Sequence, residues 1–196
     1  MIRRGDDQMA IKVVIDAGHN PQGINAGAEG QGYREQDLVY VVAQDLARLL
    51  RANGNFEVRL TRNTPDEVLG TSNATSLQER VRLANEWPAD YFISIHANAS
   101  TNPAVNGTEV YTYRDTGAAH ELAQEIQEAI VAEMDMRDIG VKTNPSLYVL
   151  RRTTMPAVLV ELGFITNAED VRKMAENPEG FARAIYNGML DYFELS

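Results

Sequence analysis

The chain alternates short apolar runs with longer amphipathic segments from residue 11 to its end. Short apolar runs are typical of buried strands, and apolar residues at helical spacing between them indicate helices that pack on a sheet. This alternation predicts an α/β layer fold and not a helical bundle or a β-sandwich. The predicted strands are 11–17, 56–61, 90–96, 108–113, 147–150 and 157–162.

Between the strands, the sequence carries signals for the ends of helices. REQDLVYVVAQDLARLLRANG has apolar residues at helical spacing and stops at Gly54, a residue that suits the left-handed conformation ending many helices. Asn177 and Pro178 open a last helix, with proline at its first position. Two capping boxes predict the starts of two further helices. They are Ser76 with Glu79 and Thr166 with Glu169.

Length and composition fit one ordinary domain. The 196 residues are 44% apolar, which is enough for a single buried core. We expect residues 1–10 to be a flexible N-terminal extension and residues 11–196 to form one domain. The extension lacks the apolar centre of a signal peptide, and no stretch reaches the roughly 20 apolar residues of a membrane-spanning helix. We therefore expect a soluble chain with no signal peptide and no transmembrane segment.

The charge balance excludes several kinds of partner. A formal net charge of -10 and a pI near 4.8 argue against nucleic-acid binding, which needs clustered lysine and arginine, and against adhesion to an anionic membrane. We expect no nucleic-acid partner, no membrane insertion and a monomeric protein. The absence of cysteine excludes disulfides, thiolate metal ligands and a cysteine nucleophile.

Polar residues stand where several predicted strands end. His19 follows the first strand, and His96 closes the strand DYFISIH. Functional residues of α/β sheets gather at the carboxyl ends of strands, so both imidazoles face one crevice if these strands are parallel neighbours. Glu161 lies within the apolar strand AVLVEL, where a carboxylate is costly unless it binds a partner or performs chemistry. Glu35 begins the first helix after a glycine-rich loop that can fold back and place it beside His19.

Two imidazoles and one carboxylate, with a position left for water, are the arrangement of a catalytic zinc site. Simpler roles stay open for each residue at this stage. His19 and His96 would be surface or capping residues. Glu35 would be an acid in the first turn of a helix, where the helix dipole favours it.

Other charged residues also have structural explanations. Glu161 would pair with Arg151 or Arg152, and Arg62 and Arg80 are predicted to be partners in structural ion pairs. Asp16 and Asn167 are predicted to support the site or cap a helix, with capping favoured for Asn167. Residues that could contact the carboxylates of an anionic substrate are Arg137, Lys142, Arg151 and Arg152.

Several blocks of the sequence resemble one enzyme family in order and spacing. The blocks, which precede the final helix, are DAGHN, GAEGQGYRE, VRLTR, SLQERVRLAN, SIHANAS and YVLRRTTMPAVLVELGFITN. From residue 11 to the C-terminus, the chain is similar to the zinc-dependent N-acetylmuramoyl-L-alanine amidases of the Amidase_3 type.

The resemblance implies a fold, a cofactor and a reaction. The fold is α/β, with a twisted, mainly parallel six-stranded sheet flanked by helices on both faces, and residues 11–196 are a single catalytic amidase domain. Zn²⁺ is bound by His19, Glu35 and His96. The reaction is hydrolysis of the amide between N-acetylmuramic acid and L-alanine of the stem peptide in bacterial peptidoglycan, by zinc-activated water with Glu161 as general base and acid.

Two other classes of function stay open from the sequence. A zinc peptidase or another amidohydrolase would use the same ligands to cut a different bond. A non-catalytic cell-wall-binding module would keep the metal site without turnover. For an enzyme that acts on the cell wall, a phage endolysin, a sporulation or germination enzyme and a trimmed secreted autolysin all fit.

Overall fold

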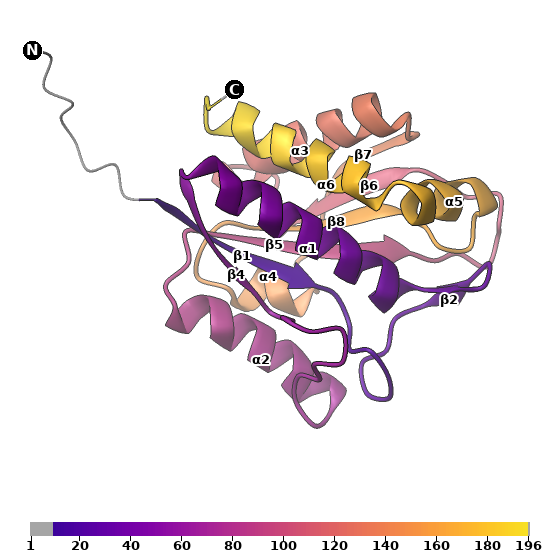
Figure 1. Cartoon of the computed structure of the whole chain (residues 1–196), viewed down its shortest axis with the longest axis horizontal. Helices are drawn as coiled ribbons and strands as arrows, with labels where there is room; N and C mark the ends of the chain where they lie inside the picture. The colour runs from indigo at the N-terminus through magenta and orange to yellow at the C-terminus, as the bar shows by residue number, and fades with distance from the viewer. Residues whose placement is uncertain (1–9, 196) are drawn as a thin grey trace, which may run out of the picture.

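The computed structural model describes residues 10–195. They form three layers, with a central sheet between two layers of helices (Figure 1), so the α/β prediction is confirmed. The flexible extension predicted at residues 1–10 falls, apart from Ala10, outside the described residues. No helix among the described residues combines the length and the apolar character needed to cross a membrane.

Strands and helices alternate along the described part of the chain. The strands are β1 (Ile11–Ala17), β2 (Glu29–Gly30), β3 (Tyr33–Arg34), β4 (Phe56–Leu60), β5 (Tyr91–Asn98), β6 (Thr108–Thr112), β7 (Asp138–Thr143) and β8 (Ala157–Phe164). The helices are α1 (Glu35–Asn53), α2 (Asn73–Glu86), α3 (Ala118–Met134), α4 (Tyr148–Arg152), α5 (Ala168–Glu176) and α6 (Pro178–Tyr192).

The longer strands form one six-stranded sheet in the order β4-β1-β5-β8-β6-β7. β4, β1, β5 and β8 are parallel, β6 runs antiparallel to β8, and β7 is parallel to β6. Helices α1, α3 and α6 cover one face, and α2 and α4 cover the other (Figure 1). The mainly parallel sheet is therefore confirmed, and β1 and β5 are the parallel neighbours that a shared crevice for the two histidines requires.

Alternate residues of each strand face opposite layers of helices. In β8, Val158 and Val160 belong to the core beneath α1, α3 and α6. Ala157 and Leu159 pack towards α2 and α4. Glu161 continues this second series, so its carboxylate lies on the α2/α4 face of the sheet.

The prediction of a strand at 147–150 is wrong, because most of this segment forms α4. Val149 and Leu150 bury one side of this short helix, which contacts α2 and β8. An apolar run this short does not distinguish a strand from one turn of a buried helix. The sixth strand of the sheet is instead β7, an edge strand of half-buried and exposed residues that no apolar run marks.

The predicted ends of α1 and α6 are confirmed. α1 stops before Gly54, which adopts a left-handed conformation (φ 81°) that residues with side chains rarely take. α6 begins at Pro178, and the Asn177 side chain accepts a hydrogen bond from the Gly180 amide. This bond satisfies one of the free amides of the first turn.

Both predicted capping boxes are wrong by a few residues. The box before α2 is formed by Ser72 and Thr75, so the helix starts one turn earlier than predicted. Ser76 instead lies at a buried position inside α2, where its hydroxyl accepts a hydrogen bond from another part of the chain. α5 is capped by Asn167, whose side chain accepts from two amides of the first turn, so Thr166 is not its cap. The capping role favoured for Asn167 is confirmed.

Candidate metal centre

Three of the predicted site residues meet at the carboxyl ends of the central strands. His19 lies in the loop after β1, His96 lies near the end of β5, and Glu35 is the first residue of α1. Glu35 Oε1 lies 3.0 Å from His19 Nε2 and 3.0 Å from His96 Nδ1. One potential ligand atom from each residue lies within 4.8 Å of the others. The fold thus brings together the two imidazoles and the carboxylate singled out in the sequence.

Glu35 is buried and its carboxylate is held from several sides. Oε1 also accepts a hydrogen bond from the Ala97 amide (3.0 Å), and Oε2 accepts one from the Ala28 amide (2.9 Å). Burial alone raises the pKa of Glu35, but the hydrogen bonds and charges of His19 and His96 lower this pKa to well below its usual range. The group is therefore ionised, as a metal ligand must be.

Two glycines permit this close packing. A Cβ at Gly18 would lie 2.5 Å from the ring of His96, and one at Gly27 would lie 2.8 Å from the Glu35 side chain. These distances are too short for any residue with a side chain. Both glycines therefore set how closely the loop after β1 can approach the candidate ligands.

His19 has a constrained backbone that fixes the direction of its ring. Its φ of 65° lies in the left-handed region, which residues other than glycine rarely occupy. Nδ1 lies 3.2 Å from the Asn25 carbonyl oxygen. When Nδ1 carries the proton and donates it to this oxygen, the lone pair of Nε2 is directed towards Glu35. The His19 carbonyl accepts hydrogen bonds from Arg80 (2.6 Å) and Arg62 (3.4 Å). These contacts hold the loop in the conformation that aims Nε2 into the cluster.

Arg80 and Asp16 form a buried ion pair behind His19. Arg80 Nη1 lies 2.5 Å from Asp16 Oδ1, and the two side chains are 1% and 0% exposed. The hydroxyls of Thr61 and Ser94 each donate a hydrogen bond of 2.7 Å to Asp16. Burial raises the pKa of Asp16, but the charge of Arg80 and the hydroxyl donors lower it below its ordinary value. The prediction that Arg80 is a structural ion-pair partner is confirmed.

Arg62 does not form the predicted ion pair with any carboxylate in residues 10–195. Its guanidinium donates to the carbonyls of Gln36 (3.2 Å) and Pro65 (2.9 Å) and lies 5.1 Å from the centre of the Tyr40 ring. Burial lowers the pKa of Arg62, and the positive charge of Arg80 lowers it further. Arg62 therefore joins loops around the site through their carbonyl oxygens.

Glu161 stands beside the cluster without a hydrogen-bonding partner for one oxygen. It is paired across the sheet with His96 of β5 and with Glu109 of β6. Its Oε2 is buried and forms no hydrogen bond within the described residues. Burial raises the pKa of Glu161 well above its ordinary value, and the charges of Glu35 and Glu109 raise it further. Such an uncompensated carboxylate is typical of a functional site.

The alternative in which Glu161 pairs with Arg151 or Arg152 is wrong. Both guanidiniums lie near the Tyr148 ring, 5.9 and 6.0 Å from its centre. Neither forms an ion pair with Glu161 in the part of the chain that the structure describes. A structural ion pair therefore does not account for this carboxylate.

Sequence reasoning missed Glu109, which lies beside Glu161 on β6. Glu109 is 2% exposed, its Oε1 accepts from Asn98 (2.7 Å) and Tyr111 (2.8 Å), and its Oε2 pairs with Lys142. In TEVYTY this acid alternates with apolar residues, a pattern typical of a solvent-facing position. The pairing of β6 with β8 turns it towards the site instead. Lys142, a predicted contact for substrate carboxylates, is already paired with this acid.

A cavity of about 260 Å³ adjoins the candidate ligands. His19 and His96 line it from the sheet side, and Leu77, Tyr148 and Leu159 add an apolar wall. A mostly apolar recess with a few convergent polar groups is the usual form of a small-molecule site. A substrate bound here would lie against both imidazoles.

Several known proteins of similar sequence are named as N-acetylmuramoyl-L-alanine amidases. The Amidase_3 family, described as N-acetylmuramoyl-L-alanine amidase, matches residues 13–191. N-acetylmuramoyl-L-alanine amidase LytC of Bacillus subtilis (strain 168) is 38% identical over 187 residues, which cover 92% of this chain and 35% of LytC. N-acetylmuramoyl-L-alanine amidase CwlM of Bacillus licheniformis is 37% identical over 190 residues, which cover 95% of this chain and 70% of CwlM. The chain thus spans about a third of the length of LytC.

Solved structures share the whole fold. An N-acetylmuramoyl-L-alanine amidase from Clostridium difficile 630 matches with a TM-score of 0.84 and 32% identity, over 94% of this chain and 97% of the other. The CwlD amidase from Clostridioides difficile, solved in complex with the GerS lipoprotein, matches with a TM-score of 0.87 and 27% identity, over 95% of this chain and 100% of the other. The chain belongs to the Amidase_3 family of N-acetylmuramoyl-L-alanine amidases.

Proposed function

We propose that the chain is a zinc-dependent hydrolase that cleaves the amide between N-acetylmuramic acid and L-alanine of the stem peptide in peptidoglycan. Family membership and the activity named for LytC and CwlM support the choice of bond. One structural observation carries the mechanism. His19, Glu35 and His96 converge directly beside Glu161, a carboxylate with a buried oxygen that accepts no hydrogen bond from the described part of the chain.

The donor set fits zinc. Two imidazole nitrogens and one carboxylate oxygen are a ligand combination that Zn²⁺ takes in catalytic sites, where a fourth position stays open. When bound, zinc would polarise the scissile carbonyl as a Lewis acid and lower the pKa of water towards about 7. In this proposal His19 Nε2, His96 Nδ1 and a Glu35 oxygen hold the ion.

Glu161 is the proton-transfer residue in this proposal. It accepts a proton from the attacking water as the bond between oxygen and the carbonyl carbon forms. It then gives the proton to the amine nitrogen of L-alanine as the carbon–nitrogen bond breaks. The lack of a structural partner leaves the carboxylate free for both steps.

In this proposal, residues 11–196 form one catalytic domain. This domain acts on the cell wall as a monomer. The three candidate ligands and Glu161 come from elements of a single sheet and one helix packed on it. No second unit is needed to complete the cluster.

Digestion of purified peptidoglycan tests the proposed reaction. Cleavage should release stem peptides with a new free amino group on L-alanine, identified by mass spectrometry and end-group labelling. New ends within the peptide would support a zinc peptidase instead, and binding without release would support a wall-binding module.

The variant Glu161→Gln separates catalysis from metal binding. It should keep its zinc and its fold while the rate falls by roughly 10² to 10⁴, the usual effect of a positioned proton-transfer group. Zinc content and amide hydrolysis are measured on the same sample. An active variant, or one without zinc, would overturn the role given to Glu161.

A further inference from the structure

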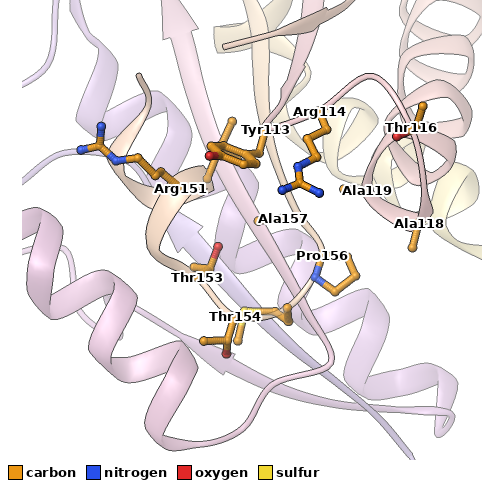
Figure 2. A pocket seen from close by; sticks show the side chains of 12 residues that line it. Tyr113, Arg114, Thr116, Ala118, Ala119, Arg151, Thr153, Thr154, Pro156 and Ala157 are labelled. Carbon is orange, nitrogen blue, oxygen red and sulfur yellow. The ribbon is translucent and has the colours of Figure 1, made fainter. Parts of the chain in front are cut away.

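A second cavity, of about 450 Å³, lies at the other end of β8 from Glu161. It is formed by the connection between β6 and α3, by the end of α4 with the loop after it, and by the first residue of β8. Tyr113, Arg114, Arg151 and Thr153 are among its lining residues. Figure 2 shows Tyr113 between the two arginines, with the guanidinium of Arg114 pointing inward, towards Ala157.

This cavity lies in line with the candidate active site. Ala157 and Glu161 point to the same face of β8, and four residues along a strand correspond to about 13 Å. On the neighbouring strand β6, Glu109 is paired with Glu161 and Tyr111 with Leu159. Tyr113 follows in the same series and reaches the cavity. The side chains on this face of β8 and β6 therefore form a row from the candidate active site to the cavity.

The face of β6 and β7 along this line is buried at Glu109, which is 2% exposed, and becomes more exposed towards the cavity. Helix α3 contacts β6 and β7 from the opposite side of the sheet. On the side away from α3 the side chain of Lys142 is 44% exposed, Tyr113 is 36% exposed, and Tyr111 is partly exposed. An extended ligand can therefore lie along this face without displacing a helix.

The charge of the cavity is unusual for an acidic protein. The formal net charge is -10, yet Arg114 and Arg151 form no ion pair within residues 10–195. The guanidinium of Arg114 lies 5.6 Å from the centre of the Tyr113 ring. The guanidinium of Arg151 points away from the cavity, and that of Arg114 points into it (Figure 2). Arg114 therefore supplies the positive charge of the cavity, and the planar donor fork of arginine matches a carboxylate.

We propose that this cavity binds a carboxylate of the stem peptide, three or four residues beyond the scissile amide, with Arg114 as its main contact. The inference rests on the proposed function, because it assumes that the peptide side of the substrate leaves the active site along β6. An extended peptide advances about 3.3–3.6 Å per residue, so its third or fourth residue reaches the cavity from Glu161. A peptide that ends at its third or fourth residue presents its C-terminal carboxylate at this distance. Arg114 would then set the preference for long stems.

Cleavage of two muropeptides tests this inference. One carries a full stem peptide and the other is trimmed after its second residue, so that it cannot reach Arg114. Arg114→Gln should lower kcat/KM for the full-length substrate roughly 10- to 100-fold, as expected for one lost charge-assisted hydrogen bond, and leave the trimmed substrate unaffected. Arg114→Lys, which keeps the charge but not the fork, should give an intermediate loss.

Arg183→Gln is the matched control for the change in net charge. Arg183 lies on α6, against the opposite face of the sheet, and its only ion pair in the described residues is with Glu179 at the surface. This variant should cleave both substrates like the wild type. Equal losses on both substrates for Arg114→Gln, or no loss on the longer one, would overturn the inference. A wild type that cleaves neither substrate would overturn the proposed function and the inference with it.

Discussion

The buried pair of Arg80 and Asp16 allows a quantitative test of how His19 is held. Arg80→Met keeps an unbranched side chain with similar helix propensity, but removes every hydrogen bond that the guanidinium donates. These include bonds to Asp16, to the Ala17 carbonyl and to the His19 carbonyl, at 2.5, 2.7 and 2.6 Å. Asp16 would stay buried with two hydroxyl donors. Breaking a buried pair in this way costs about 3–5 kcal/mol of the free energy of unfolding.

Arg82 on the same helix is the matched control. Its guanidinium pairs with Glu79 and Glu86, and its side chain is 49% exposed. Exposed ion pairs are screened by solvent, so Arg82→Met should lower the free energy of unfolding much less than Arg80→Met does. Combining Arg80→Met with Asp16→Asn removes the unpaired charge of the buried Asp16. The double variant should therefore recover part of the free energy of unfolding lost in Arg80→Met.

Two measurements separate stability from metal binding in these variants. Urea denaturation of the zinc-free proteins gives the free energy of unfolding without added stabilisation by metal. Zinc titration against a chelator gives the affinity, which should fall about 10- to 100-fold in Arg80→Met, as for other partners that orient a ligand. Equal unfolding free energies in Arg80→Met and Arg82→Met would refute the importance of the pair. Unchanged zinc affinity in a destabilised Arg80→Met would show that the pair does not aim His19.

Three further predictions concern the metal and pH. His96→Ala should lose bound zinc and activity together. Full zinc occupancy of this variant in metal analysis would exclude His96 as a ligand. Removing zinc from the wild type should lower Tm in calorimetry and adding zinc should restore it, because a bound metal stabilises the folded state; an unchanged Tm would contradict this. The pKa of Asp16 is raised by burial but lowered more by Arg80 and the hydroxyl donors, to below its ordinary 3.8. Asp16 therefore stabilises the fold above pH 3.8 and loses this contribution as pH falls through its folded pKa. Acid titration of the free energy of unfolding should be shallower in Asp16→Asn, and identical curves would refute this reading.

Elements with a clear apolar pattern are the ones that the sequence predicts well. β1 has the predicted bounds because its residues are buried from Val13 to Ala17, and an apolar run shows this directly. β7 is missed because it lies at the sheet edge, has exposed ends and contains Gly140. α4 is mistaken for a strand because a single buried turn has no measurable period. The other edge strand, β4, is predicted to within one residue because its burial alternates regularly. Local pattern thus predicts elements with a clear apolar pattern and fails where an element is short or lacks one.

The candidate site can be predicted as a set of residues but not as an arrangement. His19, His96 and Glu161 stand out because each interrupts or ends an apolar run, and Glu35 because it follows a glycine-rich loop. Their distances depend on the order of strands, which is set by pairings between distant segments. Glu109 shows the limit, since the pairing of β6 with β8 alone turns an apparently solvent-facing acid towards the site. The ligand and catalytic roles themselves stay predictions.

Three carboxylates lie close together at this end of the sheet, and they differ in how their charge is offset. Glu35 is compensated by two imidazoles and two amides. Glu109 is compensated by Lys142 and by neutral donors. Glu161 has a buried oxygen that no donor of residues 10–195 reaches. Burial raises the pKa of Glu161, and the charges of Glu35 and Glu109 raise it further. Burying such a carboxylate costs stability, and groups perturbed in this way cluster at functional sites. Its position beside three candidate ligands for a cation, whose charge would offset its own, is the physical reason for proposing Glu161 as the proton-transfer residue.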